Sequence, residues 1–329
     1  MTLTTPQWIE ATQAVDAAAT ILIVTHVKPD GDAIGSLMAL THILRERGKL
    51  VTPAVDDGVP EHLRYVPGTE GVISKLKGGK WDLMISVDAS DEARTGIAGV
   101  YGRKRCPKVI NLDHHPTNTM FGDLFIVVPD AVSSTEIVYD WMLHMGQSLA
   151  QPTAVALLTG LITDTRGLRT SNVKSRTLEI AQRLIEAGAS LTEVVEKALD
   201  NTSYRTIQLW KRGLATVDMA NGVIEATITQ ADLQEVGAVE ATDYGLVSLL
   251  SGVNEALVAI VYKEQPGNKV ELSIRCKPGF DVGSVAFALG GGGHKQASGA
   301  TIDGPLDEAK ARVRPLLEEA VKQGTLTIV

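Results

Sequence analysis

Short, largely apolar runs that end at acidic or imidazole side chains are the feature that most constrains this fold. Examples are Ile21–Val24, Leu83–Val87 and Val109–Leu112. Runs of this length are typical of strands that are buried on both faces of a parallel sheet. Segments with helical periodicity, such as Ala33–Arg47, lie between them. The alternation predicts an α/β domain with a mostly parallel sheet.

We predict five strands and several flanking helices in this N-terminal part. The strands are expected at 21–24, 50–55, 83–87, 108–112 and 124–128. Helices are expected at 8–19, 33–47, 93–105 (in part), 153–162 and 171–187. A further helix is expected to begin at Ser133-Ser134-Thr135-Glu136, because Ser133 and Glu136 have the spacing of a capping box.

The pattern changes beyond residue 214, and it predicts a smaller α+β domain. Asn221-Gly222 lies between two strand-like runs and is a strong hairpin signal. A second hairpin is expected around Gln265-Pro266-Gly267-Asn268, and helices are expected at 282–289 and 306–323. The predicted organisation is therefore a first domain at 1–188, a helical linker at 189–214 and a second domain at 215–329.

Composition excludes several functional classes. The 329 residues carry a net charge of −8, which argues against a long nucleic-acid footprint. Cys106 and Cys276 have no paired spacing and are expected to be free thiols in a reducing compartment. Residues 1–10 lack the pattern of a secretory signal, and no apolar run approaches the ~20 residues that a membrane helix needs. We therefore expect a cytoplasmic protein without membrane contact, and we leave a homodimer open.

Ionisable side chains follow several of the predicted strands. Ligands bind outside the carboxyl ends of the strands in parallel sheets, so these side chains are expected to gather there. The six candidate metal ligands are His26, Asp30, Asp32, Asp88, His114 and Asp164. Four carboxylates and two imidazoles could hold two divalent cations if one carboxylate bridges them. Mixed Asp and His ligation favours manganese over structural zinc.

Each feature also has a simpler interpretation. Pro29-Asp30-Gly31 could be an ordinary turn, Asp88 could cap a helix, and the adjacent histidines could lie in a solvated loop. The run Gly290–Gly293 before His294 could be a flexible linker. Alternatively, its bare backbone N–H groups could cradle an anion, with Arg275 as a bidentate phosphate contact.

Taken in order, these motifs resemble the DHH phosphoesterase superfamily. The motifs are His26-x-x-x-Asp30-x-Asp32, Asp88, Asp113-His114-His115 and Asp164-Thr165, and Gly290 to His294 resembles the family's DHH-associated C-terminal domain. The chain is similar in size to the nanoRNase/pAp-phosphatase branch. This resemblance implies a manganese enzyme that degrades very short RNA and dephosphorylates 3′-phosphoadenosine 5′-phosphate (pAp). Related members cleave linear or cyclic dinucleotides.

The resemblance also implies a role for each site residue. Asp88 would bridge the two cations, Asp113 would orient His114, and His115 would contact the scissile phosphate. A bridging hydroxide would attack the phosphorus in line, and Asp88, Asp113, His115 and Arg275 are the expected catalytic residues. Substrate contacts are expected from Ser134, Arg275, Gly291, Gly292, Gly293 and His294. The C-terminal domain would favour very short chains.

Three alternatives remain at this point. They are a family II inorganic pyrophosphatase, a phosphodiesterase specific for cyclic di-AMP or pApA, and a nucleotide sensor without catalytic activity. One position departs from the family pattern, because Arg166 follows Asp164-Thr165 where glycine is frequent. Arg166 could add a cation near the substrate or point to solvent.

Overall fold

The computed structural model describes residues 5–238 and 245–325. It divides into two compact units, Met1–Asn201 and Thr202–Val329. Within the described residues, no helix combines the length and apolar character needed to cross a membrane. The predicted absence of a secretory signal concerns residues 1–10, of which 1–4 lie outside the described part of the chain.

The first unit is built on a five-stranded parallel sheet with the order β2-β1-β3-β4-β5. Its strands are β1 (Thr20–Val24), β2 (Leu50–Ala54), β3 (Leu83–Val87), β4 (Val109–Asp113) and β5 (Leu124–Val127). This confirms the predicted α/β class and the five strands. Since all the strands are parallel, their carboxyl ends meet at one edge of the sheet.

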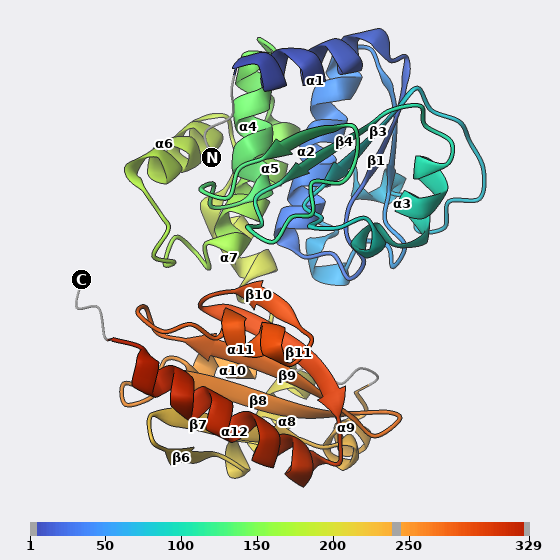
Figure 1. Cartoon of the computed structure of the whole chain (residues 1–329). Helices are drawn as coiled ribbons and strands as arrows, with labels where there is room; N and C mark the ends of the chain where they lie inside the picture. The colour runs from blue at the N-terminus through green and yellow to red at the C-terminus, as the bar shows by residue number, and fades with distance from the viewer. Residues whose placement is uncertain (1–4, 239–244, 326–329) are drawn as a thin grey trace. The chain divides into compact units, whose positions relative to one another are not determined.

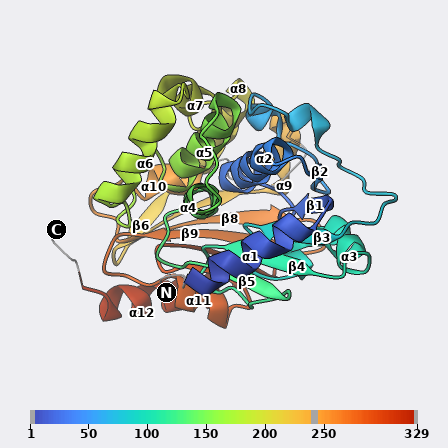
Figure 2. The same ribbon diagram turned by 90° about the horizontal axis from the view of Figure 1, so that it is seen from above.

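Helices cover both faces of this sheet (Figures 1 and 2). They are α1 (Thr5–Ala17), α2 (Gly31–Glu46), α3 (Gly96–Arg103), α4 (Ser134–His144), α5 (Gln151–Asp164), α6 (Ser175–Glu186) and α7 (Leu191–Ala198), with short 3-10 turns at Glu61–Leu63, Thr69–Gly71 and Ala93–Thr95. One face packs against α1, α2, α4, α5 and α6 in a large apolar core, and the opposite face packs against α3.

Several boundaries differ from the sequence prediction. The helix expected at 93–105 is split, because Gly96 with a φ of +64° separates a 3-10 turn from α3. The linker helix expected at 189–214 forms two helices, α7 and α8 (Tyr204–Ala215), each begun by its own serine cap, Ser190 and Ser203. Helix α7 packs against α5 in the first unit, whereas α8 packs against β7 in the second.

The second unit contains a six-stranded mixed sheet with the order β10-β11-β9-β8-β7-β6. The strands are β6 (Asp218–Ala220), β7 (Val223–Ile228), β8 (Val258–Gln265), β9 (Lys269–Cys276), β10 (Gly292–His294) and β11 (Ala297–Asp303). Helices α11 (Gly283–Ala288) and α12 (Leu306–Gln323) pack on one face, and α8, α9 (Gln230–Val236) and α10 (Leu246–Leu250) pack on the other (Figure 1).

Both predicted hairpins are present, and the glycine run is a strand. Asn221 and Gly222 join β6 to β7 with φ angles of +51° and +78°. Residues Gly292–His294 form the edge strand β10, which pairs with β11. A Cβ on Gly291 would lie 2.1 Å from the Gly299 carbonyl oxygen, so this close approach requires glycine. The glycine run is therefore an ordered sheet edge and no flexible linker.

Close packing of α2 against α5 brings two candidate ligands together. Asp32 lies in the first turn of α2, and Asp164 is the last residue of α5. The helices approach through glycines, since a Cβ on Gly35 would lie 2.6 Å from the carbonyl oxygen of Ala156. A Cβ on Gly160 would lie 2.5 Å from Oδ1 of Asp32. The distance between these two carboxylates therefore depends on small residues at the helix interface.

We expect Gly35→Ala to destabilise the protein by about 1–3 kcal/mol, because the added methyl group overpacks the α2–α5 interface. The matched control is Gly71→Ala, because no atom of the described residues lies within 4 Å of an added Cβ there. We expect this control to stay within about 0.5 kcal/mol of the wild type. Urea unfolding measures both free energies, and equal values for the two variants would contradict this account of the interface.

Candidate metal centre

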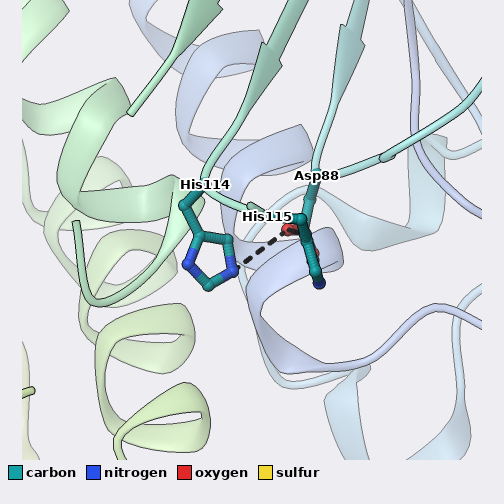
Figure 3. A group of neighbouring side chains, drawn as sticks. All are labelled: Asp88, His114 and His115. Atoms are coloured by element: carbon teal, nitrogen blue, oxygen red, sulfur yellow. Dashed lines mark ion pairs between the residues drawn. The ribbon is translucent and has the colours of Figure 1, made fainter. Parts of the chain in front are cut away.

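The carboxyl edge of the parallel sheet gathers all six side chains that the sequence predicted as metal ligands. Asp88 follows β3, and His114 and His115 follow β4, the neighbouring strand. Figure 3 shows the His114 ring directed toward the Asp88 carboxylate. Among the described residues, the candidate ligands form two groups of three that do not overlap, His26 with Asp30 and Asp88, and Asp32 with His114 and Asp164.

The first group is formed at the ends of β1 and β3. Nε2 of His26 lies 3.8 Å from Oδ1 of Asp30 and 3.6 Å from Oδ2 of Asp88. Asp30 also caps α2, because its Oδ1 accepts hydrogen bonds from the backbone N–H groups of Asp32 and Ala33. The cap fixes the loop that carries Asp30. Oδ2 of Asp30 accepts neither of these two hydrogen bonds.

The second group lies between α2, β4 and α5. Nε2 of His114 lies 3.9 Å from Oδ2 of Asp32 and 3.3 Å from Oδ2 of Asp164. Asp32 is almost fully buried, at 1% exposure, whereas the Asp164 side chain is 29% exposed. The group therefore combines a carboxylate from the protein interior, Asp32, with one that solvent can reach, Asp164.

Asp88 lies between the two groups. Its Oδ2 faces His26, and its Oδ1 lies 3.8 Å from Nε2 of His114. Asp88 has a φ of +56°, a left-handed conformation that is unusual for any residue except glycine. Backbone strain of this kind clusters at functional sites, where surrounding contacts hold the residue in place.

Backbone carbonyl groups orient both imidazoles of the candidate ligand set. Nδ1 of His26 lies 2.9 Å from the Val27 carbonyl oxygen, and Nδ1 of His114 lies 3.4 Å from that of Ala131. A proton on Nδ1 that is donated to a carbonyl leaves Nε2 as the ligand nitrogen. In both residues it is Nε2 that faces the carboxylates, which is the orientation that metal ligation requires.

Crowded negative charge raises the proton affinity of this site. Burial, followed by the charges of Asp88 and Asp164, raises the pKa of Asp32. Burial and the charges of Asp30 and Asp88 likewise raise the pKa of Asp164. Burial lowers the pKa of His26, but its contacts with Asp30 and Asp88 outweigh burial and raise that pKa to about 10. A divalent cation would compensate the same charge that these protons compensate.

The N-terminus of α4 supports two of the candidate ligands. The backbone N–H groups of Ser134 and Thr135 donate to Oδ2 and Oδ1 of Asp32 at 2.6 Å and 3.0 Å. The Ser134 hydroxyl donates to Oδ1 of Asp88 at 2.9 Å. Ser134 is fully buried, so the structure gives it a different place from the substrate contact expected from the resemblance. It positions carboxylates at the centre.

Of the two capping residues predicted for α4, Ser133 caps the helix as expected, whereas Glu136 accepts a different N–H group. The Ser133 hydroxyl accepts the N–H of Glu136 at 3.2 Å. The Glu136 carboxylate accepts the N–H of Val132 at 2.9 Å, one residue before the cap. Thr135 was missed as a support for Asp32, although its place in the capping sequence marks it as part of a helix N-terminus, where N–H groups bind anions.

Asp113 contacts a different histidine from the one expected. Oδ1 of Asp113 lies 2.8 Å from Nδ1 of His115, so this carboxylate orients His115, whereas the resemblance implies an effect on His114. Oδ2 of Asp113 accepts a hydrogen bond from the Asn118 amide at 2.6 Å. Asn118 also donates to the Ala89 carbonyl oxygen and thereby ties the two strand ends together. No sequence signal singled out Asn118.

The remaining predicted site residues belong to the second unit. Arg275 lies on β9 opposite Ala297 of β11, and its guanidinium donates to the Ile274 carbonyl oxygen at 3.0 Å. Gly292, Gly293 and His294 are exposed on the edge strand β10. The structure therefore groups Arg275 with one end of the sheet that also carries the glycine-rich strand.

The donor set fits divalent cations that accept both oxygen and nitrogen ligands. Carboxylate oxygens and imidazole nitrogens suit manganese and related ions, and the set contains no thiolate. The ligand atoms within each group of three lie within 4.8 Å of one another. Asp88 belongs to the first group, and its Oδ1 lies 3.8 Å from Nε2 of His114 in the second, so the two groups adjoin at this carboxylate.

Comparisons with known proteins agree with this geometry. The model of the DHH family N-terminal domain matches residues 20–161, and that of the DHHA1 domain matches residues 240–323. The protein named bifunctional oligoribonuclease and PAP phosphatase NrnA from Thermus thermophilus is 33% identical over 93% of this chain and 92% of its own length.

Solved structures share the fold. An exopolyphosphatase-related protein from Bacteroides fragilis has a TM-score of 0.86 at 22% identity and covers 98% of both chains. RecJ from Thermus thermophilus, solved in complex with Mn²⁺, has a TM-score of 0.55 at 14% identity and covers 97% of this chain and 55% of its own. The chain thus belongs to the DHH family, as its sequence motifs predicted, and is a phosphoester hydrolase.

Proposed function

We propose that the chain is a manganese-dependent enzyme that hydrolyses very short RNA, dinucleotides such as pApA, and pAp. The observation that carries this proposal is the Asp88 carboxylate, whose two oxygens face His26 at 3.6 Å and His114 at 3.8 Å. A carboxylate between two ligand groups is the arrangement of enzymes that use paired cations for displacement at phosphorus. The name of the Thermus thermophilus relative supports the choice of substrates.

Two cations are proposed to occupy the two ligand groups. The residues that would hold them are His26, Asp30, Asp32, Asp88, His114 and Asp164. Manganese is favoured because it accepts mixed carboxylate and imidazole ligation, and the RecJ neighbour was solved with Mn²⁺. When bound, such cations lower the pKa of a nucleophilic water and stabilise charge on the phosphoryl oxygens.

His115 is proposed to contact the scissile phosphate. Burial lowers the pKa of His115, but the hydrogen bond with Asp113 and the charge of Asp88 outweigh burial and raise it to about 9. The imidazole is then protonated at neutral pH, with Nδ1 donating to Asp113 and Nε2 carrying the second proton. An N–H donor aimed at a phosphoryl oxygen stabilises the negative charge that grows in the transition state.

The second unit is proposed to bind the nucleotide portion of the substrate. Arg275 can donate two parallel hydrogen bonds to a phosphate. The exposed strand Gly292–His294 offers backbone groups that no side chain screens, together with the His294 imidazole. A site with few basic groups suits a substrate of a few nucleotides, which agrees with an acidic protein of net charge −8.

A substrate panel tests this function. We expect product release in the presence of Mn²⁺ from pAp, pApA and a five-nucleotide RNA, with slow release from a long RNA. Cyclic di-AMP and pyrophosphate complete the panel, and free phosphate and mononucleotides are measured. Release from pyrophosphate alone would assign a pyrophosphatase, and metal binding without turnover of any member would assign a nucleotide sensor. Either result would overturn the proposed substrates.

We expect Asp88→Asn to lower kcat/KM on pApA by more than about 100-fold, because even residues that only support metal ligands contribute 10–100-fold. Asparagine tolerates the left-handed backbone at this position, so the fold should persist. The control is Asp91→Asn, since Oδ1 of Asp91 only accepts the N–H of Arg94 and an amide oxygen can do the same. A variant at Asp88 with full activity and metal content would refute the shared-ligand scheme.

Manganese binding should release protons at neutral pH. The pKa of His26 is raised to about 10, so its imidazole is protonated below that pH and must lose a proton to become a ligand. Metal affinity should therefore rise with pH, by roughly tenfold per pH unit between pH 7 and 9 for one displaced proton. Calorimetry in buffers of different ionisation enthalpy counts the protons. An affinity that is constant over this range would contradict the charge state described here.

A further inference from the structure

The turn after α5 carries two arginines in a fixed and unusual conformation. Arg166, Gly167 and Leu168 have successive φ angles of +52°, +77° and +64°. Glycine adopts such angles without strain, whereas arginine and leucine do so at an energetic cost. An arginine at the first of these positions is therefore retained against the backbone preference, which points to a role for its side chain.

The turn is rigid, because hydrogen bonds and core packing fix it on both sides. The N–H of Gly167 donates to the Ile162 carbonyl oxygen at 2.8 Å, and the N–H of Leu168 donates to the Thr165 hydroxyl at 3.0 Å. The Leu168 side chain packs against the main apolar core of the first unit. The two arginines are thus presented by an anchored segment, although both lie on the surface.

Arg166 and Arg169 lie close together without a carboxylate to neutralise them. Nε of Arg169 donates to the Arg166 carbonyl oxygen at 2.8 Å. Neither guanidinium forms an ion pair with any residue that the structure describes, Asp164 included. Paired cations without a counter-charge are a binding site for an anion.

A hydroxyl group at the same turn lacks a partner. Oγ1 of Thr170 is buried and makes no hydrogen bond within residues 5–238 and 245–325. Because this hydroxyl is buried, the exposed donors of the turn that can recognise a phosphate are the two guanidinium groups. Asp164, a candidate metal ligand, is the last residue of α5, so the turn that carries Arg166 begins directly at the candidate metal centre.

We propose that Arg166 and Arg169 bind a second phosphate of the substrate, one that is not cleaved, and so select nucleotides that carry a terminal phosphate. This role rests on the proposed function and deepens it. It predicts that pApA is a better substrate than ApA, which lacks the 5′-phosphate, and that pAp binds more tightly than 3′-AMP.

The main variant is Arg166→Gly, because glycine accepts a φ of +52° and should keep the turn intact. We expect its kcat/KM on pApA to fall by about 10- to 100-fold, the usual contribution of hydrogen bonds between charged groups. Its kcat/KM on ApA should change less than about twofold. Arg169→Gln is a second variant with the same expectation. The control is Arg183→Ala, because Arg183 is an exposed α6 residue that pairs with Glu186.

A binding measurement separates this role from the proposed function. Titration calorimetry in EDTA compares pAp with 3′-AMP, which lacks only the 5′-phosphate, on the wild type and on Arg166→Gly, so that neither metal nor turnover contributes. Weaker binding of pAp to the variant, with 3′-AMP unchanged, supports the second phosphate site even if the wild type cleaves neither dinucleotide. Equal binding of pAp to both proteins, or equal losses on pApA and ApA, would overturn it. Thermal unfolding verifies that the variants fold.

Discussion

Repulsion among buried carboxylates is the constraint on which the rest of the first unit depends. Asp32 and Asp88 are nearly buried, and an unpaired charge in such a place is expensive. The structure offsets the cost with fixed partners: two N–H groups at the start of α4, the Ser134 hydroxyl, and the imidazoles of His26 and His114. These partners neutralise the site only in part, since the pKa of Asp32 stays raised. A bound cation would compensate the remaining negative charge.

The same requirement accounts for the parallel sheet and for the glycines that let α2 and α5 approach closely. Parallel strands place the residues after β1, β3 and β4 at one edge, so three distant segments deliver ligands without long loops. Asp164 comes from a helix, and its distance to the other ligands depends on how closely that helix approaches α2. Gly35 and Gly160 permit this approach. The apolar core and the polar centre are therefore two consequences of one packing arrangement.

The sequence predicted which side chains lie together at the site better than it predicted their hydrogen-bond partners. Strand ends and their side chains can be read from local pattern, and this was sufficient for Asp88 and His114. The pairing of Asp113 with His115 depends on two side-chain torsions and on Asn118, five residues beyond Asp113, which no periodicity reveals. Ser134 was expected to contact the substrate, yet at the N-terminus of α4 its hydroxyl donates to Asp88. Such contacts arise from tertiary packing, and a local sequence pattern does not predict them.

The two ligand groups are not equivalent, and the difference bears on how cations would enter. The Asp30 side chain is 61% exposed, whereas Asp32 in the other group is 1% exposed and its oxygens accept two backbone N–H groups. A cation beside Asp30 can exchange with solvent after one carboxylate moves. A cation beside Asp32 must also disturb hydrogen bonds at a helix terminus, so it should exchange more slowly. Asp88 belongs to the first group, and its Oδ1 lies 3.8 Å from Nε2 of His114 in the second, so one carboxylate connects the exposed position with the buried one.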